Sequence, residues 1–149
     1  NALYISHLQE DEKDLFDDIV HEISHSLESP YGYQIYADDK IKDEFLRKRI
    51  HLHDILWKSG YRAPKAFFTD TEYNEEFDMF LYEKIGYDKL SVFVQGLFLN
   101  PYAATSLREY FATGFTEFFV ESEHAFMEKV SPALYQKLIK MQNPIEFDM

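Results

Sequence analysis

The stretch DDIVHEISHSLE, residues 17–28, carries two histidines four positions apart, with a glutamate directly after the first. Residues four apart on an α-helix lie about 40° from each other, so His21 and His25 project from one face. Neutral imidazole nitrogens bind zinc at about 2.0–2.1 Å. Glu22 lies about 100° round the helix, within reach of a metal-bound water. This H-E-x-x-H spacing indicates a zinc site with a glutamate as general base. The alternative is a solvated helix whose histidines bind nothing.

The residues around this stretch predict one helix over residues 9–28. Its first turns are acidic, which the helix dipole favours. Apolar residues spaced three and four apart predict a core-facing stripe opposite the histidine pair, formed by Phe16, Val20, Ile23 and Leu27. SPYGY, residues 29–33, is expected to end this helix. ALYISHL, residues 2–8, alternates in a way that predicts a short strand, whose exposed edge could hold an extended substrate.

The rest of the chain is predicted to be mainly helical. RAPKAFF, residues 62–68, is expected to be a loop, and the apolar residues 88–102 favour a helix broken before Pro101. In the last predicted helix, Ser131 is the N-cap and Pro132 the first helical residue. Four other helices are expected, at 38–61, 71–87, 104–122 and 122–130. In the first of these, the buried residues are expected to be Phe45, Ile50, Ile55 and Leu56. In the second, they are expected to be Phe77, Phe80 and Leu81, with Gly86 at the end of the helix.

Composition limits the classes of function. The 149 residues, 46% hydrophobic, suit one globular domain spanning 1–149. The absence of cysteine leaves His, Asp and Glu as metal ligands. A net charge of −12 argues against nucleic acid as a partner, and no apolar run is long enough to insert in a membrane. Residue 1 is Asn, so we expect a fragment of a larger protein, with its localisation open, and a monomer.

A third metal ligand is expected on the helix at 104–122. Glu109 lies among apolar residues, and a buried carboxylate is costly unless it is paired or bound to a metal. Its alternative role is a salt bridge to a neighbour such as Arg108. Residues 112–114 are small, which allows another helix to approach closely. The downstream histidines, His51, His53 and His124, are expected at the surface.

The spacing of Tyr102, Glu109, two aromatic residues and Ala112 resembles a family of zinc peptidases, the gluzincins related to the anthrax lethal factor catalytic domain and the Pro-Pro endopeptidases. The resemblance covers residues 15–28 and 100–141. It implies a zincin-like fold, with His21, His25 and Glu109 as ligands of one Zn²⁺ and Glu22 as the base. It also implies that the Tyr102 phenol donates to the developing oxyanion.

The sequence departs from that family between the two blocks. Eighty-three residues separate His25 from Glu109, so 35–95 is interpreted as a helical insertion. Thr113 stands where the family often has an acidic residue, which leaves the support of a histidine to Glu117 or Asp18. The expected fold class is therefore mainly α (α+β), with a small edge sheet, an active-site helix and this insertion.

The sequence favours a zinc-dependent endopeptidase acting on a peptide or protein substrate. Two other interpretations remain open. One is an inactive zinc-binding interaction module of a larger toxin, phage or surface protein, which the insertion and Thr113 favour. The other is a helical domain with no metal, to which chelators would make no difference.

Overall fold

The computed structural model describes residues 12–121 and 124–142. In this part of the chain all regular structure is helical, as predicted. The helices are α1 (Glu12–Tyr36), α2 (Lys40–Lys58), α3 (Lys65–Thr69), α4 (Glu75–Met79), π-helix η1 (Phe80–Ile85), α5 (Tyr87–Phe93), 3-10 helix η2 (Pro101–Ala104), α6 (Leu107–Val120), α7 (Ala125–Val130) and α8 (Pro132–Met141). The strand predicted at 2–8 lies outside the described residues.

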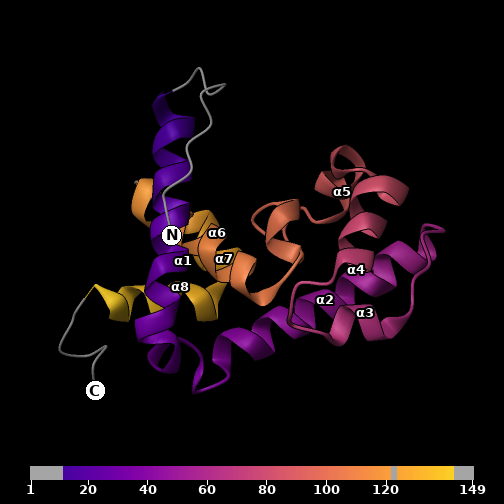
Figure 1. The fold of residues 1–149 in the computed structure, drawn as a ribbon. Helices are drawn as coiled ribbons and strands as arrows, with labels where there is room; N and C mark the ends of the chain where they lie inside the picture. Colours follow the sequence, from indigo (N-terminus) through magenta and orange to yellow (C-terminus); the bar gives the residue numbers. More distant parts are fainter. Residues whose placement is uncertain (1–11, 122–123, 143–149) are drawn as a thin grey trace.

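Two groups of helices share one core. Helix α1 packs against α6, and α6 packs against α7 and α8. Figure 1 shows α2 leading away from these helices toward α3, α4 and α5. Phe45, Leu52 and Leu56 of α2 are fully buried and belong to the same hydrophobic cluster as Phe111 of α6. The segment 35–95 is therefore helical and contributes to the core; that it is an insertion remains a prediction. Within the described residues, no helix is long and apolar enough to cross a bilayer.

The predicted end of the first helix is wrong. SPYGY does not stop α1, which continues through Pro30 to Tyr36. Proline removes one backbone hydrogen bond, but tertiary contacts on the following turns offset that loss. Ile35 is fully buried, and the Tyr36 hydroxyl donates to Glu28 at 2.6 Å. Packing of the last turns thus overrides the local signal to stop.

The predicted stripe on α1 is also wrong in part. Val20 is buried, but Phe16 and Ile23 are 52% and 45% exposed. The buried face runs instead through Val20 and the fully buried Ser24 toward the histidines. Because the histidines meet α6, they lie beside the packed face and not opposite it. The hydrophobic pattern alone placed that face too far round the helix.

The helix predicted over residues 88–102 is only partly formed, since α5 ends at Phe93 and turns follow it. The RAPKAFF segment is not wholly loop, since it contains the start of α3. Gly86 follows η1 with φ 87°, a backbone conformation that favours glycine. A Cβ at Gly114 would overlap the buried Leu134 side chain, so this glycine allows α6 and α8 to approach closely. Phe77 and Leu81 are buried as expected, and Ile50, Ile55 and Phe80 are half-buried.

Helix α8 begins where predicted, but with an unexpected cap. Ser131 is the N-cap and Pro132 the first residue. The Ser131 hydroxyl oxygen lies 3.1 Å from the Tyr110 hydroxyl oxygen. The buried Glu44 of α2 accepts from the backbone N–H of Ala133 at 2.6 Å, and from the Tyr110 hydroxyl at 2.6 Å. This carboxylate satisfies donors at the helix N-terminus and locks α2 to α6 and α8.

Candidate metal centre

Helix α6 presents Glu109 from its first turn. Ser106 is the N-cap, and its hydroxyl accepts from the Glu109 backbone N–H at 3.2 Å. A carboxylate in the first turn is favoured by the helix dipole. The Ser-x-x-Glu spacing is that of a capping box, in which the glutamate side chain turns back to the N-cap. Here the carboxylate points instead toward α1.

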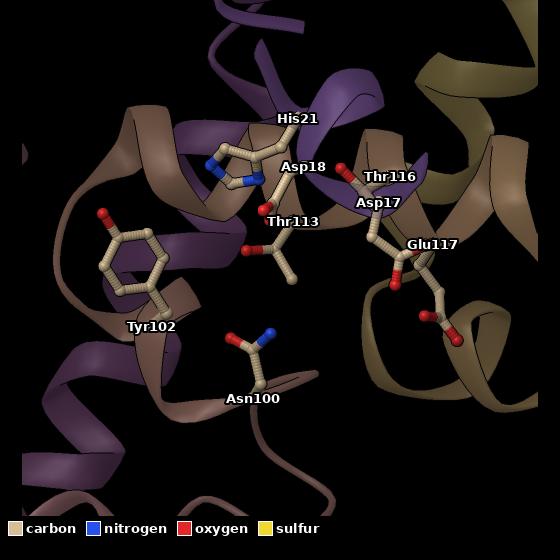
Figure 2. Close-up of a pocket in the computed structure, with 8 residues that line it drawn as sticks. All are labelled: Asp17, Asp18, His21, Asn100, Tyr102, Thr113, Thr116 and Glu117. Carbon is tan, nitrogen blue, oxygen red and sulfur yellow. The ribbon is translucent and has the colours of Figure 1, made fainter. Parts of the chain in front are cut away.

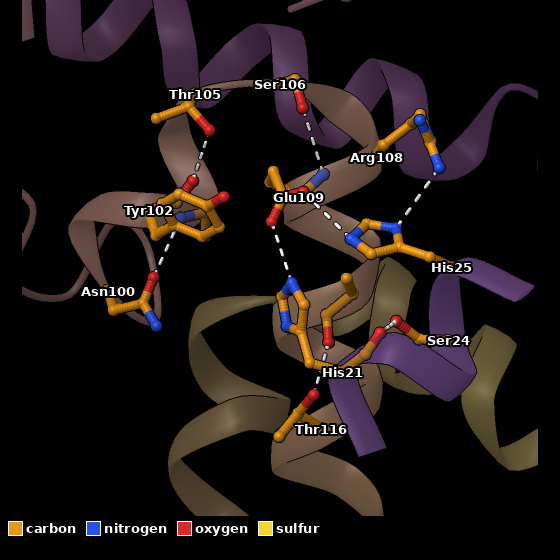
Figure 3. Close-up of polar contacts among 12 residues, drawn as sticks. His21, Ser24, His25, Asn100, Tyr102, Thr105, Ser106, Arg108, Glu109 and Thr116 are labelled. Carbon is orange, nitrogen blue, oxygen red and sulfur yellow. Dashed lines mark hydrogen bonds and ion pairs between the residues drawn. The ribbon is translucent and has the colours of Figure 1, made fainter. Parts of the chain in front are cut away.

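The Glu109 carboxylate lies between the two histidines of α1 (Figure 3). Nε2 of His21 is 3.0 Å from Oε2, and Nε2 of His25 is 3.0 Å from Oε1. One ligand atom from each of the three residues lies within 4.8 Å of the other two. Their side chains are 15–23% exposed, so the group is partly shielded from solvent and still in contact with it. The structure thus brings together the three residues that the sequence nominated as ligands.

The charges of this group depend on one another. Hydrogen bonds to Glu109 and then to Glu28 raise the pKa of His25 to about 9. Burial alone would raise the pKa of Glu109, but hydrogen bonds from His21 and His25 outweigh it and lower that pKa to about 2. In the metal-free protein an anionic Glu109 is therefore neutralised by a cationic His25 at neutral pH. A divalent cation could replace the proton that gives His25 its charge.

Glu28 supports His25 from the other side of the ring. Its Oε1 lies 3.1 Å from Nδ1 of His25. The carboxylate is itself held by the Tyr36 hydroxyl at 2.6 Å and by Nε of Arg108 at 3.3 Å. Arg108 thus pairs with Glu28, and the predicted alternative of an Arg108 salt bridge to Glu109 is not formed. A carboxylate on the second nitrogen fixes the tautomer and orientation of a metal-binding histidine.

Sequence reasoning missed Glu28, although a signal for it was present. Glu28 is three residues after His25 and seven after His21, so it shares their helix face. The residues named for this role, Asp18 and Glu117, lie on the side of His21, as does Thr113. They line a cavity of about 410 Å³ beside His21, together with Asp17, Asn100, Tyr102 and Thr116 (Figure 2).

Tyr102 faces the site from η2. Its ring centroid is 6.1 Å from that of His21, and the side chain is about half exposed at the cavity. The Asn100 side chain caps η2 by accepting from the Ala103 N–H at 2.9 Å, which fixes the segment that carries the tyrosine. Burial, and then the nearby charge of Glu109, raise the pKa of Tyr102. The phenol therefore stays protonated and able to donate.

Glu22 is exposed next to His21. Within the described residues, no hydrogen bond or ion pair holds its carboxylate. Its charge adds to the effects of burial and of Glu109 that raise the pKa of Tyr102. A carboxylate that is solvated and unrestrained there can accept a proton from water.

Arg49 connects α2 to the segment between Tyr102 and Glu109. This arginine is 1% exposed, and its guanidinium lies over the rings of Phe45 and Phe77. It donates to the carbonyl of Ala104 at 3.0 Å and to those of Phe67 and Asp70 at 2.5 and 3.0 Å. Burial lowers its pKa to about 10. Nothing in the sequence pattern distinguishes Arg49 from the exposed Arg47.

Three more histidines lie in the described part of the chain, and none of them joins the group. His51 is exposed, as expected, whereas His53 is half-buried with its ring 5.1 Å from that of Phe68. His124 was expected at the surface, but it stacks on Phe118, with centroids 4.7 Å apart. Its Nε2 lies 2.8 and 2.9 Å from the carbonyls of Phe118 and Glu121. It therefore closes the C-terminal end of α6.

Comparison with protein-family models, curated proteins and solved structures gives no match to the chain. The likeness to the gluzincins therefore stays a prediction from sequence motifs.

Proposed function

We propose that this chain is a zinc-dependent endopeptidase, with His21, His25 and Glu109 as the zinc ligands. One observation carries the proposal: two imidazole Nε2 atoms from consecutive turns of α1 converge on one carboxylate of α6. Two histidines and a glutamate are a donor set of catalytic zinc, which keeps a further position open for water or substrate. The H-E-x-x-H spacing supplies a general base next to these ligands.

The residues fit such an ion in chemistry and spacing. Ligand bonds of about 2.0–2.1 Å at tetrahedral angles separate the ligand atoms by roughly 3.4 Å. The His–Glu contacts of 3.0 Å already lie near that value, and the whole group lies within 4.8 Å. Small side-chain rotations would therefore suffice. Glu28 on the far nitrogen of His25 supplies the orienting carboxylate that zinc-binding histidines usually have.

Bound zinc would polarise the scissile carbonyl and make water a nucleophile near neutral pH. Glu22 accepts the proton of the attacking water and then delivers it to the leaving amine. The Tyr102 hydroxyl donates a hydrogen bond to the oxyanion that forms on the carbonyl oxygen. The cavity between His21 and Tyr102 gives a substrate chain room beside these groups.

Metal content is the first test. Zinc per chain is measured by elemental analysis after dialysis without chelator, in the wild type, in Glu109→Ala and in the control Glu128→Ala, which changes an exposed glutamate of α7. We expect close to one zinc in the wild type and the control, and clearly weaker binding in Glu109→Ala. Zinc absent from all three after adding it back would mean that the group is only an ion-pair network.

Glu22→Gln then separates an enzyme from an inactive zinc-binding module. The variant should keep its zinc and lose casein cleavage by about 10²–10⁴-fold, because the amide cannot accept the proton. Glu12→Gln, at an exposed position of the same helix, should cleave normally. A zinc-loaded wild type that cleaves no peptide bond in a peptide library would favour the interaction module.

A further inference from the structure

The only tryptophan of the chain lies at the surface. Trp57, near the C-terminal end of α2, is 43% exposed. It borders a cavity of about 550 Å³ lined by His53, Trp57, Arg62, Ala63, Pro64 and Lys65, which we call the Trp57 patch. Leaving so large an apolar side chain in water is costly, and tryptophan and arginine are the residue types that most often dominate protein interfaces.

The patch is a platform held from behind by the core. The His53 ring lies 5.4 Å from the Trp57 ring and 5.1 Å from that of Phe68, which is 1% exposed. The Arg62 guanidinium lies 5.0 Å from the centre of the Trp57 ring. These contacts restrict the indole to one orientation, so little side-chain entropy remains to be lost when a ligand binds.

Charge separates this patch from the rest of the molecule. The chain carries −12 overall, yet residues 55–69 contain Lys58, Arg62 and Lys65 and no acidic residue. No ion pair engages these three cations within the described residues. Asp54 lies at the edge of the patch, where its Oδ1 is 3.0 Å from Nδ1 of His53. The patch is therefore apolar in its centre and cationic at its rim.

We propose that the Trp57 patch binds an acidic peptide segment of a partner protein. An apolar side chain of the peptide packs on the indole and against Ala63 and Pro64, and flanking carboxylates pair with Arg62 and Lys65. A short acidic peptide suits this site better than a nucleic acid, because a long polyanion would be repelled by the remaining surface. The inference does not depend on the metal centre.

The single tryptophan makes the test direct. The wild-type chain is titrated at low salt with a seven-residue peptide that has a central phenylalanine, one glutamate on each side of it and serine at the other positions. Burial of the indole should shift the Trp57 emission to shorter wavelength and saturate. The same peptide with lysines in place of the glutamates should give no shift. Added salt should weaken binding, because the rim contacts are screened.

Variants locate the binding surface. With a dye-labelled peptide followed by anisotropy, Arg62→Glu with Lys65→Glu and, separately, Trp57→Ala should each weaken binding about tenfold or more. Lys129→Glu with Lys140→Glu changes the charge equally at exposed positions of α7 and α8 and should bind normally. The proposal would be overturned if both double variants lost the same peptide affinity, or if the wild type gave no saturable emission shift. It would also be overturned if oligothymidine bound more tightly than the peptide, or if self-association produced the shift. Glu109→Ala should leave peptide binding unchanged, which separates this result from any failure of the metal site.

Discussion

Glu28 lies 3.1 Å from Nδ1 of His25 and leaves Nε2 of that ring facing Glu109. The Glu28 carboxylate thus orients the imidazole, and the Glu109 carboxylate lies at the nitrogen that is proposed to bind the metal. Because Tyr36 and Arg108 hold Glu28 in turn, the last turns of α1 and the start of α6 both stabilise the histidine.

Glu28→Ala should therefore weaken zinc binding by about 10–100-fold, the usual effect of removing such a support. Zinc affinity is measured by competition with a chromophoric chelator. Glu12→Ala, an exposed change on the same helix, is the control and should bind as the wild type does. Unchanged affinity in Glu28→Ala would show that Glu28 serves only the packing of α1.

Tyr102→Phe removes the proposed oxyanion donor and little else. The rate constant kcat should fall by roughly 10²–10³-fold, as for other single donors, while zinc content stays the same. Tyr33→Phe is a matched control, because Tyr33 is 81% exposed. If Tyr102→Phe cleaved casein at the wild-type rate, the tyrosine would be a packing residue at the rim of the cavity.

The stability of the metal-free protein should depend on pH, and zinc should oppose the loss of stability at high pH. The raised pKa of His25 contributes stability that is complete below pH 6.5 and is lost as pH rises through about 9. The lowered pKa of Glu109 contributes stability present above pH 4.5 and lost as pH falls through about 2. Together they favour the metal-free fold most between pH 4.5 and 6.5.

Zinc competes with the proton on His25, so its stabilising effect should grow with pH. Melting temperatures with zinc and with EDTA are compared between pH 6.5 and 9, the interval over which His25 loses its proton. We expect the difference between the two melting temperatures to widen as pH rises. In His25→Asn this difference should be smaller and should depend less on pH. A difference that narrows with pH would contradict the assignment of His25 as a ligand.

Arg49→Met should destabilise the fold by about 2–4 kcal/mol, since it leaves buried carbonyl groups without donors. Urea unfolding measures this, with Arg47→Met as the exposed control. Because Ala104 lies between Tyr102 and Glu109, the folded variant should also lose activity. A free energy of unfolding equal to that of the control would mean that water replaces the guanidinium.

The sequence by itself determined the helical class, most helix positions and the candidate ligands. It could do so because helical periodicity places residues four apart on one face, and because a carboxylate among apolar residues signals a partner. The predictions for Gly86, for Gly114 and for the N-cap Ser131 depended on equally local rules.

Only the tertiary structure decided which face of α1 is buried and where that helix ends. Both depend on contacts with distant residues: α6 draws the histidine side inward, and the burial of Ile35 carries the helix past Pro30. The roles of Arg49 and Glu44 were likewise invisible in the sequence pattern. A buried charge is stable only where donors and acceptors from several segments meet, and the fold alone brings those segments together.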